Sequence, residues 1–163
     1  MTVVADTSVL LSLALLHQEG LLGKLFAKTL APIEVQREFQ RLAGEDTRFA
    51  GLEFPAFVEI QKADRPVNLP SAAIRLHAGE VSALILAKSI RADFLLMDER
   101  AGRAVAAEMG QKTIGVLGLL IEAKRRGLVA SLEPFLDRLQ REGGFWIAPQ
   151  LRQFVLSAGL ESN

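Results

Sequence analysis

Two aspartates follow apolar runs of the kind that form buried strands. Asp6 comes directly after residues 2–5, and Asp98 comes directly after residues 94–97. In open α/β sheets, sites form beyond the carboxyl ends of the strands, so we expect both carboxylates at one edge of one sheet. Burying a carboxylate there is costly unless something offsets its charge. The alternative interpretation is that each aspartate only caps the helix that follows it.

Two glutamates add to this acidic set. Glu38 lies late on a helix predicted to begin near Pro32, beside its apolar stripe, and Glu80 opens a later helix after Gly79. Taken singly, Glu38 is better explained as a solvated helix charge. Glu80 taken singly is better explained as a first-turn glutamate that interacts with the helix dipole. The two glutamates gain a chemical meaning only together with the two aspartates.

Four converging carboxylates repel one another strongly. Two unit charges 4 Å apart cost about 4 kcal/mol at an effective dielectric constant of 20. Such a cluster persists only when protons or a divalent cation neutralise it. The chain has no cysteine and two histidines, and neither histidine has a second histidine at metal-binding spacing. Ligation by oxygen alone favours Mg²⁺ or Mn²⁺ over zinc.

Short strand-like runs alternate with longer helical segments along the chain. This alternation predicts an α/β fold, a three-layer α/β/α arrangement around a mostly parallel central sheet of about five strands. Half of the 163 residues are apolar and the length suits one domain. Within residues 1–163, we expect 128–163 to form a helical extension that packs on the rest of the chain or on a second copy. The expected strands are 2–5, 57–60, 94–97 and 113–115, and the expected helices are 9–16, 21–26, 32–42, 79–88, 99–109, 116–126, 132–141 and 150–160.

Four segments together resemble the acidic motifs of the PIN domain family, metal-dependent nucleases that include the toxins of many bacterial toxin–antitoxin pairs. They are ADTSVL at 5–10, PIEVQREF at 32–39, GEVSALILA at 79–87 and LLMDER at 95–100. The stretch 101–120 is similar to a prokaryotic PIN subgroup of uncharacterised predicted nucleic-acid-binding proteins. The order and spacing of the four motifs are more specific than any one of them.

This resemblance implies a divalent-metal-dependent ribonuclease that hydrolyses phosphodiesters at a carboxylate-bound Mg²⁺ or Mn²⁺ centre. The substrate would be single-stranded or structured RNA, and the product would carry a 5′-phosphate. The residues that the resemblance assigns to the metal and to catalysis are Asp6, Glu38, Glu80 and Asp98, with Ser8 and Ser82 as supporting residues.

The chain departs from the family pattern at two positions. Many relatives carry an aspartate where Ser82 stands and a small hydroxyl residue where Leu96 stands. The acid here is Glu80, and its longer side chain is expected to reach the site. These departures keep open a second hypothesis, a non-catalytic PIN-like module that binds nucleic acid or a protein.

Two other phosphate chemistries are excluded by single features. An Asp-x-Asp phosphotransferase needs a second aspartate where Ser8 stands. A Rossmann-type nucleotide binder needs a Gly-x-Gly-x-x-Gly motif after the first strand, and none follows it.

Nineteen basic and nineteen acidic residues give a net charge of zero, so RNA contact requires a local patch. Residues 88–126 carry eight basic and five acidic side chains, and we expect Lys88, Arg100 and Arg103 to contact phosphates. A solvated helix face is the equal alternative. No segment has the pattern of a secretory signal or a membrane span, which predicts a cytoplasmic protein without membrane contact.

The remaining partner predictions concern other protein chains. The resemblance and the apolar C-terminal helices favour a homodimer, and a toxin would also have an antitoxin partner that blocks the acidic pocket. We expect Phe145 and Trp146 to make core or dimer contacts rather than to stack on bases. The apolar residues behind the dimer prediction are Phe135, Leu136, Leu139, Phe154 and Leu156.

Overall fold

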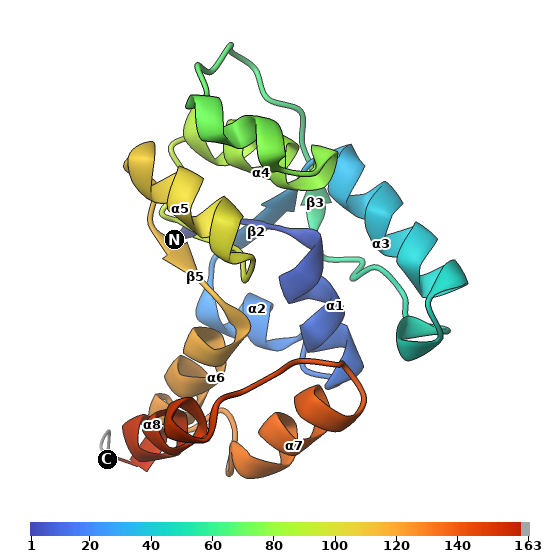
Figure 1. The fold of residues 1–163 in the computed structure, drawn as a ribbon, viewed down its shortest axis with the longest axis vertical. Coiled ribbons are helices and arrows are strands. Elements are labelled where there is room, and N and C mark those ends of the chain that lie inside the picture. Colours follow the sequence, from blue (N-terminus) through green and yellow to red (C-terminus); the bar gives the residue numbers. More distant parts are fainter. Residues whose placement is uncertain (161–163) are drawn as a thin grey trace.

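The computed structural model describes residues 1–160, and a parallel sheet lies at its centre (Figure 1). Its five strands are arranged in the order β3-β2-β1-β4-β5, and every neighbouring pair is parallel. The predicted α/β class with about five mostly parallel strands is therefore confirmed. The strands are β1 (Thr2–Ala5), β2 (Lys28–Ala31), β3 (Glu59–Ile60), β4 (Phe94–Leu96) and β5 (Thr113–Ile114).

Helices cover both faces of the sheet and complete the three layers. Helix α1 packs on α3 and α6, whereas α4 packs on β1, β4 and α5. None of the helices in residues 1–160 combines the length and apolarity needed to cross a membrane. The helices are α1 (Thr7–Leu15), α2 (Leu21–Leu25), α3 (Ile33–Glu45), α4 (Ala78–Ser89), α5 (Arg100–Glu108), α6 (Val116–Arg125), α7 (Glu133–Arg141) and α8 (Pro149–Leu160), with 3₁₀ turns η1 (Thr47–Phe49) and η2 (Ser71–Arg75).

The central strand β1 is buried on both faces. Val3, Val4 and Ala5 are fully buried, which explains why this strand has no polar alternation. Its neighbours are β2 on one side and β4 on the other, so the chain connections diverge at the carboxyl end of β1. That divergence is the position where open α/β sheets form their sites.

Two strands differ from the sequence prediction. β2 was not predicted, because four residues between two helical segments carry too little periodicity to stand out. β3 is limited to Glu59–Ile60 instead of covering 57–60, and both of its residues are exposed at the edge of the sheet. Pairing with β2 nevertheless fixes β3 in the sheet, since Leu30 of β2 is in register with Glu59.

The C-terminal segment packs on its own chain within the described residues, and 161–163 of the predicted extension lie outside them. Helix α8 lies against α6 (Figure 1). Arg152 joins α8 to α7, with its guanidinium 2.6 Å from Asp137 Oδ1 and 3.8 Å from Glu133 Oε1. Leu136 and Leu139 belong to the core of the same chain, so they do not form a dimer face.

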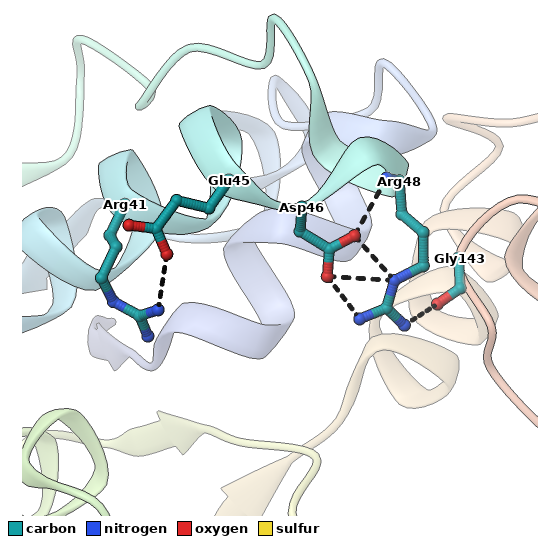
Figure 2. Close-up of polar contacts among 5 residues, drawn as sticks. All are labelled: Arg41, Glu45, Asp46, Arg48 and Gly143. Atoms are coloured by element: carbon teal, nitrogen blue, oxygen red, sulfur yellow. Dashed lines mark hydrogen bonds and ion pairs between the residues drawn. The ribbon is translucent and has the colours of Figure 1, made fainter.

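A polar contact also joins the segment after α7 to the end of α3. Figure 2 shows the Arg48 guanidinium between the Asp46 carboxylate, at 2.7 Å, and the Gly143 carbonyl oxygen, which accepts at 3.2 Å. Trp146, three residues further on, is 80% exposed. Trp146 is therefore not part of the core, and its predicted dimer contact stays a prediction, whereas Phe145 is partly buried against the core.

Candidate active site

Asp6 lies at the carboxyl end of β1, in the centre of the sheet. Its backbone N–H donates to the Leu96 carbonyl oxygen at 2.9 Å, which extends the pairing of β1 with β4. The residue is only 3% exposed. Because β1 and β4 are parallel neighbours, Asp6 and Asp98 follow adjacent strand ends, as the sequence predicted.

The charge environment of Asp6 is strongly acidic. Burial is the main reason that the pKa of its carboxyl rises to about 7, and a hydrogen bond from the Thr7 backbone N–H lowers it in part. The negative charges of Glu80, Glu38 and Glu99 raise this pKa further. The structure therefore brings three glutamates from three elements within electrostatic range of one buried aspartate.

Glu80 and Glu38 approach the site from α4 and α3. Glu80 is 8% exposed, and burial raises its pKa, which His77 lowers and the charges of Glu99 and Glu38 raise. The Glu38 carboxylate rests against the first turn of α4, where a Cβ on Gly79 would lie 2.6 Å from its Oε2. Glu80 is therefore no solvated charge, and Glu38 points toward the strand ends.

Asp98 follows β4, and its carboxylate bonds to α6. Oδ1 accepts a hydrogen bond from the Val116 backbone N–H at 3.0 Å. Burial raises the pKa of Asp98 to about 6, while the Val116 bond and the Arg103 charge lower it and the Glu99 charge raises it. The Asp98 carboxylate can occupy this place because residue 115 is a glycine, since a Cβ on Gly115 would collide with Asp98 Oδ1.

Neither aspartate caps the helix that follows it. Asp6 occupies the N-cap position of α1, but its side chain makes no capping hydrogen bond. The N-cap of α5 is Glu99, and Asp98 bonds to α6 instead. The capping alternative is therefore wrong for both residues.

Buried oxygens without hydrogen-bond partners gather at the same strand ends. Within residues 1–160 four buried side-chain polar atoms lack a partner, and three of them are Thr7 Oγ1, Ser8 Oγ and Asp98 Oδ2. Buried polar groups are normally satisfied, so unpartnered oxygens in one region indicate an additional partner such as an ion or its waters. A set made of hydroxyl and carboxylate oxygens fits a hard divalent cation.

The carboxylates do not form a closed cluster as they lie. Among the residues that the structure describes, no three histidine, aspartate or glutamate side chains surround one point closely enough to hold a metal. Asp98 is one reason that the cluster is open, because its Oδ1 accepts the hydrogen bond from Val116 at the start of α6. Asp6 interacts most directly with Glu80 and Glu38, and Asp98 lies next to Arg103.

Two predicted residues lie elsewhere in the structure. Ser82 faces a different cavity of about 440 Å³, beside Pro32 and Ile60. Residues two positions apart on an α-helix are rotated by about 200° around its axis, so Glu80 and Ser82 cannot face the same side of α4. The Lys88 ammonium donates to the Met109 carbonyl oxygen at 2.8 Å. Met109 follows the C-terminal end of α5, which lies at the amino edge of the sheet. The structure therefore separates Lys88 from Arg100 and Arg103, which lie on the first turns of α5 next to Asp98.

Glu99 is the acidic residue that sequence reasoning missed. Its charge raises the pKa of Asp6, Glu80 and Asp98, so it interacts with more of the acidic set than any other glutamate does. The available signal was its place directly after Asp98, which carries a second acid beyond the same strand end.

Gly79 offers a test of the Glu38 position that leaves the fold in place. Gly79→Ala puts a methyl group where the Glu38 carboxylate rests, and the flexible end of that side chain must move. We expect the affinity for Mn²⁺ to fall about tenfold, while thermal stability stays the same or rises because alanine favours helices. The matched control is Gly44→Ala on α3, where an added Cβ meets nothing within 4 Å. Calorimetric titration of both variants with Mn²⁺ gives the result, and equal affinities would mean that Glu38 takes no part in the site.

Comparison with known proteins identifies the family. No curated protein and no solved structure gives a significant match to this chain. A family model described as PIN domain matches residues 2–160, which is nearly the whole chain. PIN domains are generally nucleases that use metal ions. On this match, together with the five-stranded parallel sheet and the acidic strand ends, the chain belongs to the PIN domain family.

Proposed function

We propose that this protein is a divalent-metal-dependent endoribonuclease. The observation that carries the proposal is Asp6, a buried aspartate with a pKa raised to about 7, within electrostatic range of three glutamates and next to unpartnered hydroxyls. Such an arrangement is costly in the absence of a cation and becomes favourable when one binds.

The chain's own residues divide the work at this site. Asp6 and Asp98 would hold the cation directly, and Glu38 and Glu80 would complete the set of oxygens around it. The buried hydroxyls of Thr7 and Ser8 would orient those carboxylates or a bound water. When bound, Mg²⁺ or Mn²⁺ supplies Lewis-acid activation of a water and of the scissile phosphate for an in-line displacement. The water oxygen bonds to phosphorus and the bond to the 3′ oxygen breaks, which leaves a 5′-phosphate and a 3′-hydroxyl.

Basic side chains next to the carboxylates supply phosphate contacts. Arg103 lies beside Asp98, and Arg100 is one turn earlier on α5. On the opposite side of the acidic set, a groove of about 530 Å³ between α3 and α4 is lined by Glu38, Arg37 and Arg41. A single strand that crosses the carboxylates would thus meet arginines on both sides.

The test of the proposed function is cleavage of a single-stranded RNA pool. We expect cleavage with Mn²⁺ or Mg²⁺, products with 5′-phosphates, and no cleavage after chelation of the metal. Absence of cleavage from every RNA pool at millimolar Mn²⁺ would contradict the proposal.

One observation favours a second candidate, a PIN-like module that binds nucleic acid without cleaving it. As described above, no three acidic side chains of residues 1–160 surround a common point. The two candidates differ in outcome, because a binding module retains RNA and Mn²⁺ without releasing 5′-phosphate ends.

The finer predictions about partners follow from the family and from exposed apolar side chains. We propose a toxin role. Expression of the protein should then arrest growth, expression of the Asp6→Asn variant should not, and an antitoxin partner should relieve the arrest.

We also propose a homodimer, supported by Trp146 and Phe154, which are 80% and 64% exposed. A monomeric mass by light scattering at micromolar concentration would contradict the homodimer.

Salt dependence of RNA binding tests which basic residues touch phosphates. Replacing Arg100 and Arg103 by glutamine should make the slope of log K against log salt shallower by about 1.4, because each single-strand phosphate contact contributes about 0.7. Lys88→Gln is the control, since Lys88 lies at the other edge of the sheet and is bonded to Met109. An equal change of slope in both variants would place the RNA over a different surface.

A further inference from the structure

A cavity of about 620 Å³ lies next to Asp98, on the β4–β5 side of the sheet. Its walls are formed by strands β4 and β5, helix α6, the end of α2, Met1 and Leu151 of α8. Apolar and aromatic side chains make up most of these walls, and among them are Phe26, Phe94, Ile114 and Leu117. Its volume lies within the range of about 300–1,000 Å³ that is typical of small-ligand sites.

The charged side chains of this cavity form two oppositely charged pairs, Asp98 with Arg103 and Glu122 with Arg126. Asp98 and Arg103 both line it, and Asp98 also belongs to the acidic set at the strand ends. Asp98 Oδ2 is buried with no hydrogen-bond partner among residues 1–160. Further along α6, Arg126 is paired with Glu122 at 2.8 Å, so that wall has little free charge.

These features match a nucleobase better than a phosphate or a charged peptide. A base is flat, apolar on its faces and polar at its edge, and it stacks on aromatic side chains such as Phe94. A phosphate inside the cavity would need an excess of positive charge in its walls, whereas the two arginines there are balanced by Asp98 and Glu122. Because Asp98 borders both the cavity and the acidic set, a strand bound at the carboxylates has a neighbouring base within reach of the cavity.

We propose that this cavity receives one nucleobase of the RNA strand, adjacent to the phosphate bound at the carboxylates. The inference rests on the proposed function for its substrate class, but it concerns binding and is measured without cleavage. It predicts that one nucleotide position contributes more to affinity than its neighbours do.

Gly118 provides a variant that fills the cavity. This glycine lines the cavity from α6 and is exposed, and an added Cβ would lie 3.1 Å from Ile114 Cγ2. Gly118→Leu places a larger side chain in the cavity at a helical position, where leucine is more favourable than glycine. The matched control is Gly44→Leu on α3, which has open space around it.

The experiment measures binding of hydrolysis-resistant, phosphorothioate-linked single-stranded RNA in the presence of Mn²⁺, by fluorescence anisotropy. A series of oligonucleotides carries a single abasic residue at successive positions. We expect one abasic position to weaken binding to the wild type about tenfold, which is the size of one base–aromatic stack. In Gly118→Leu the intact oligonucleotide should bind about tenfold more weakly and the abasic one no more weakly than in the wild type. Gly44→Leu should bind both oligonucleotides as the wild type does.

Each other outcome overturns the inference or separates it from the proposed function. Equal affinity for every abasic oligonucleotide, or wild-type affinity of Gly118→Leu, overturns the nucleobase cavity while cleavage is unaffected. A changed oligomeric mass of Gly118→Leu with unchanged RNA affinity overturns it in favour of a protein-docking surface. The expected affinities in a protein that cleaves no RNA support the cavity and contradict the nuclease proposal.

Discussion

Replacing Asp6 with asparagine should abolish Mn²⁺ binding and RNA cleavage, and should at the same time stabilise the metal-free protein at pH 8. Asparagine keeps the shape of the side chain and removes the charge that burial disfavours. The pKa of Asp6 is about 7 instead of the ordinary 3.8, which corresponds to up to roughly 4 kcal/mol at pH 8. The new amide can also donate to the nearby glutamates.

Chemical denaturation at pH 8 in the presence of a chelator measures this gain, and calorimetry measures the loss of Mn²⁺ binding. The control is Glu53→Gln, which removes a carboxylate from an exposed position after η1 and should change neither quantity. An Asp6→Asn variant that is less stable than the wild type at pH 8 would mean that the aspartate is stabilised by contacts stronger than its burial cost.

The second large effect is that pH should act in opposite directions on the metal-free and the metal-loaded protein. Asp6 and Asp98 have folded-state pKa values of about 7 and 6, and the pKa of Glu80 is also raised. The folded state therefore holds protons that the unfolded state has released, so stability without metal falls as pH rises from 5 to 8.

With Mn²⁺ the order reverses, because the carboxylates must lose their protons to bind the cation. At a free Mn²⁺ concentration 100 times the Kd, binding adds about 2.7 kcal/mol to stability, equivalent to a rise in Tm of about 5–10 °C. Thermal melts from pH 5 to pH 8, with Mn²⁺ and with a chelator, should give two curves that diverge toward pH 8. Parallel curves would show that these carboxylates are not the metal ligands.

The parts of the fold that could be predicted are those that local sequence determines. β1 and β4 are continuous apolar runs that end at Asp6 and Asp98, and a run of this kind suits a strand buried on both faces. β2 could not be predicted in the same way. It is placed by pairing with β1 across about 26 residues of sequence, with Val4 in register with Leu30, and four residues carry little pattern of their own.

The candidate site shows the same division. Asp6, Asp98 and Glu80 could be found because each stands at the end of a strand or the start of a helix, whereas Glu38 lies inside α3 and could be found only as part of the four-motif resemblance. The bond from Val116 to Asp98 could not, since it depends on how the end of β5 meets α6. Lys88 and Arg100 are close in sequence but lie at opposite edges of the sheet, because β4 lies between them and carries the chain from the amino edge to the carboxyl edge. A count of charges along the chain carries no information about those edges.

The central position of β1 also determines when this acidic site can exist during synthesis. β1 is made before the other four strands of the sheet, yet its pairing with β4 needs residues 94–96, and Asp98 is made about 90 residues after Asp6. At about 5–20 residues per second, roughly 5–20 s pass before both aspartates are available. Through that interval β1 lacks its neighbour β4, and the site that it carries lacks the Asp98 carboxylate. The complete set of carboxylates that the proposed RNA cleavage requires is therefore absent from a nascent chain until most of its sheet has been made.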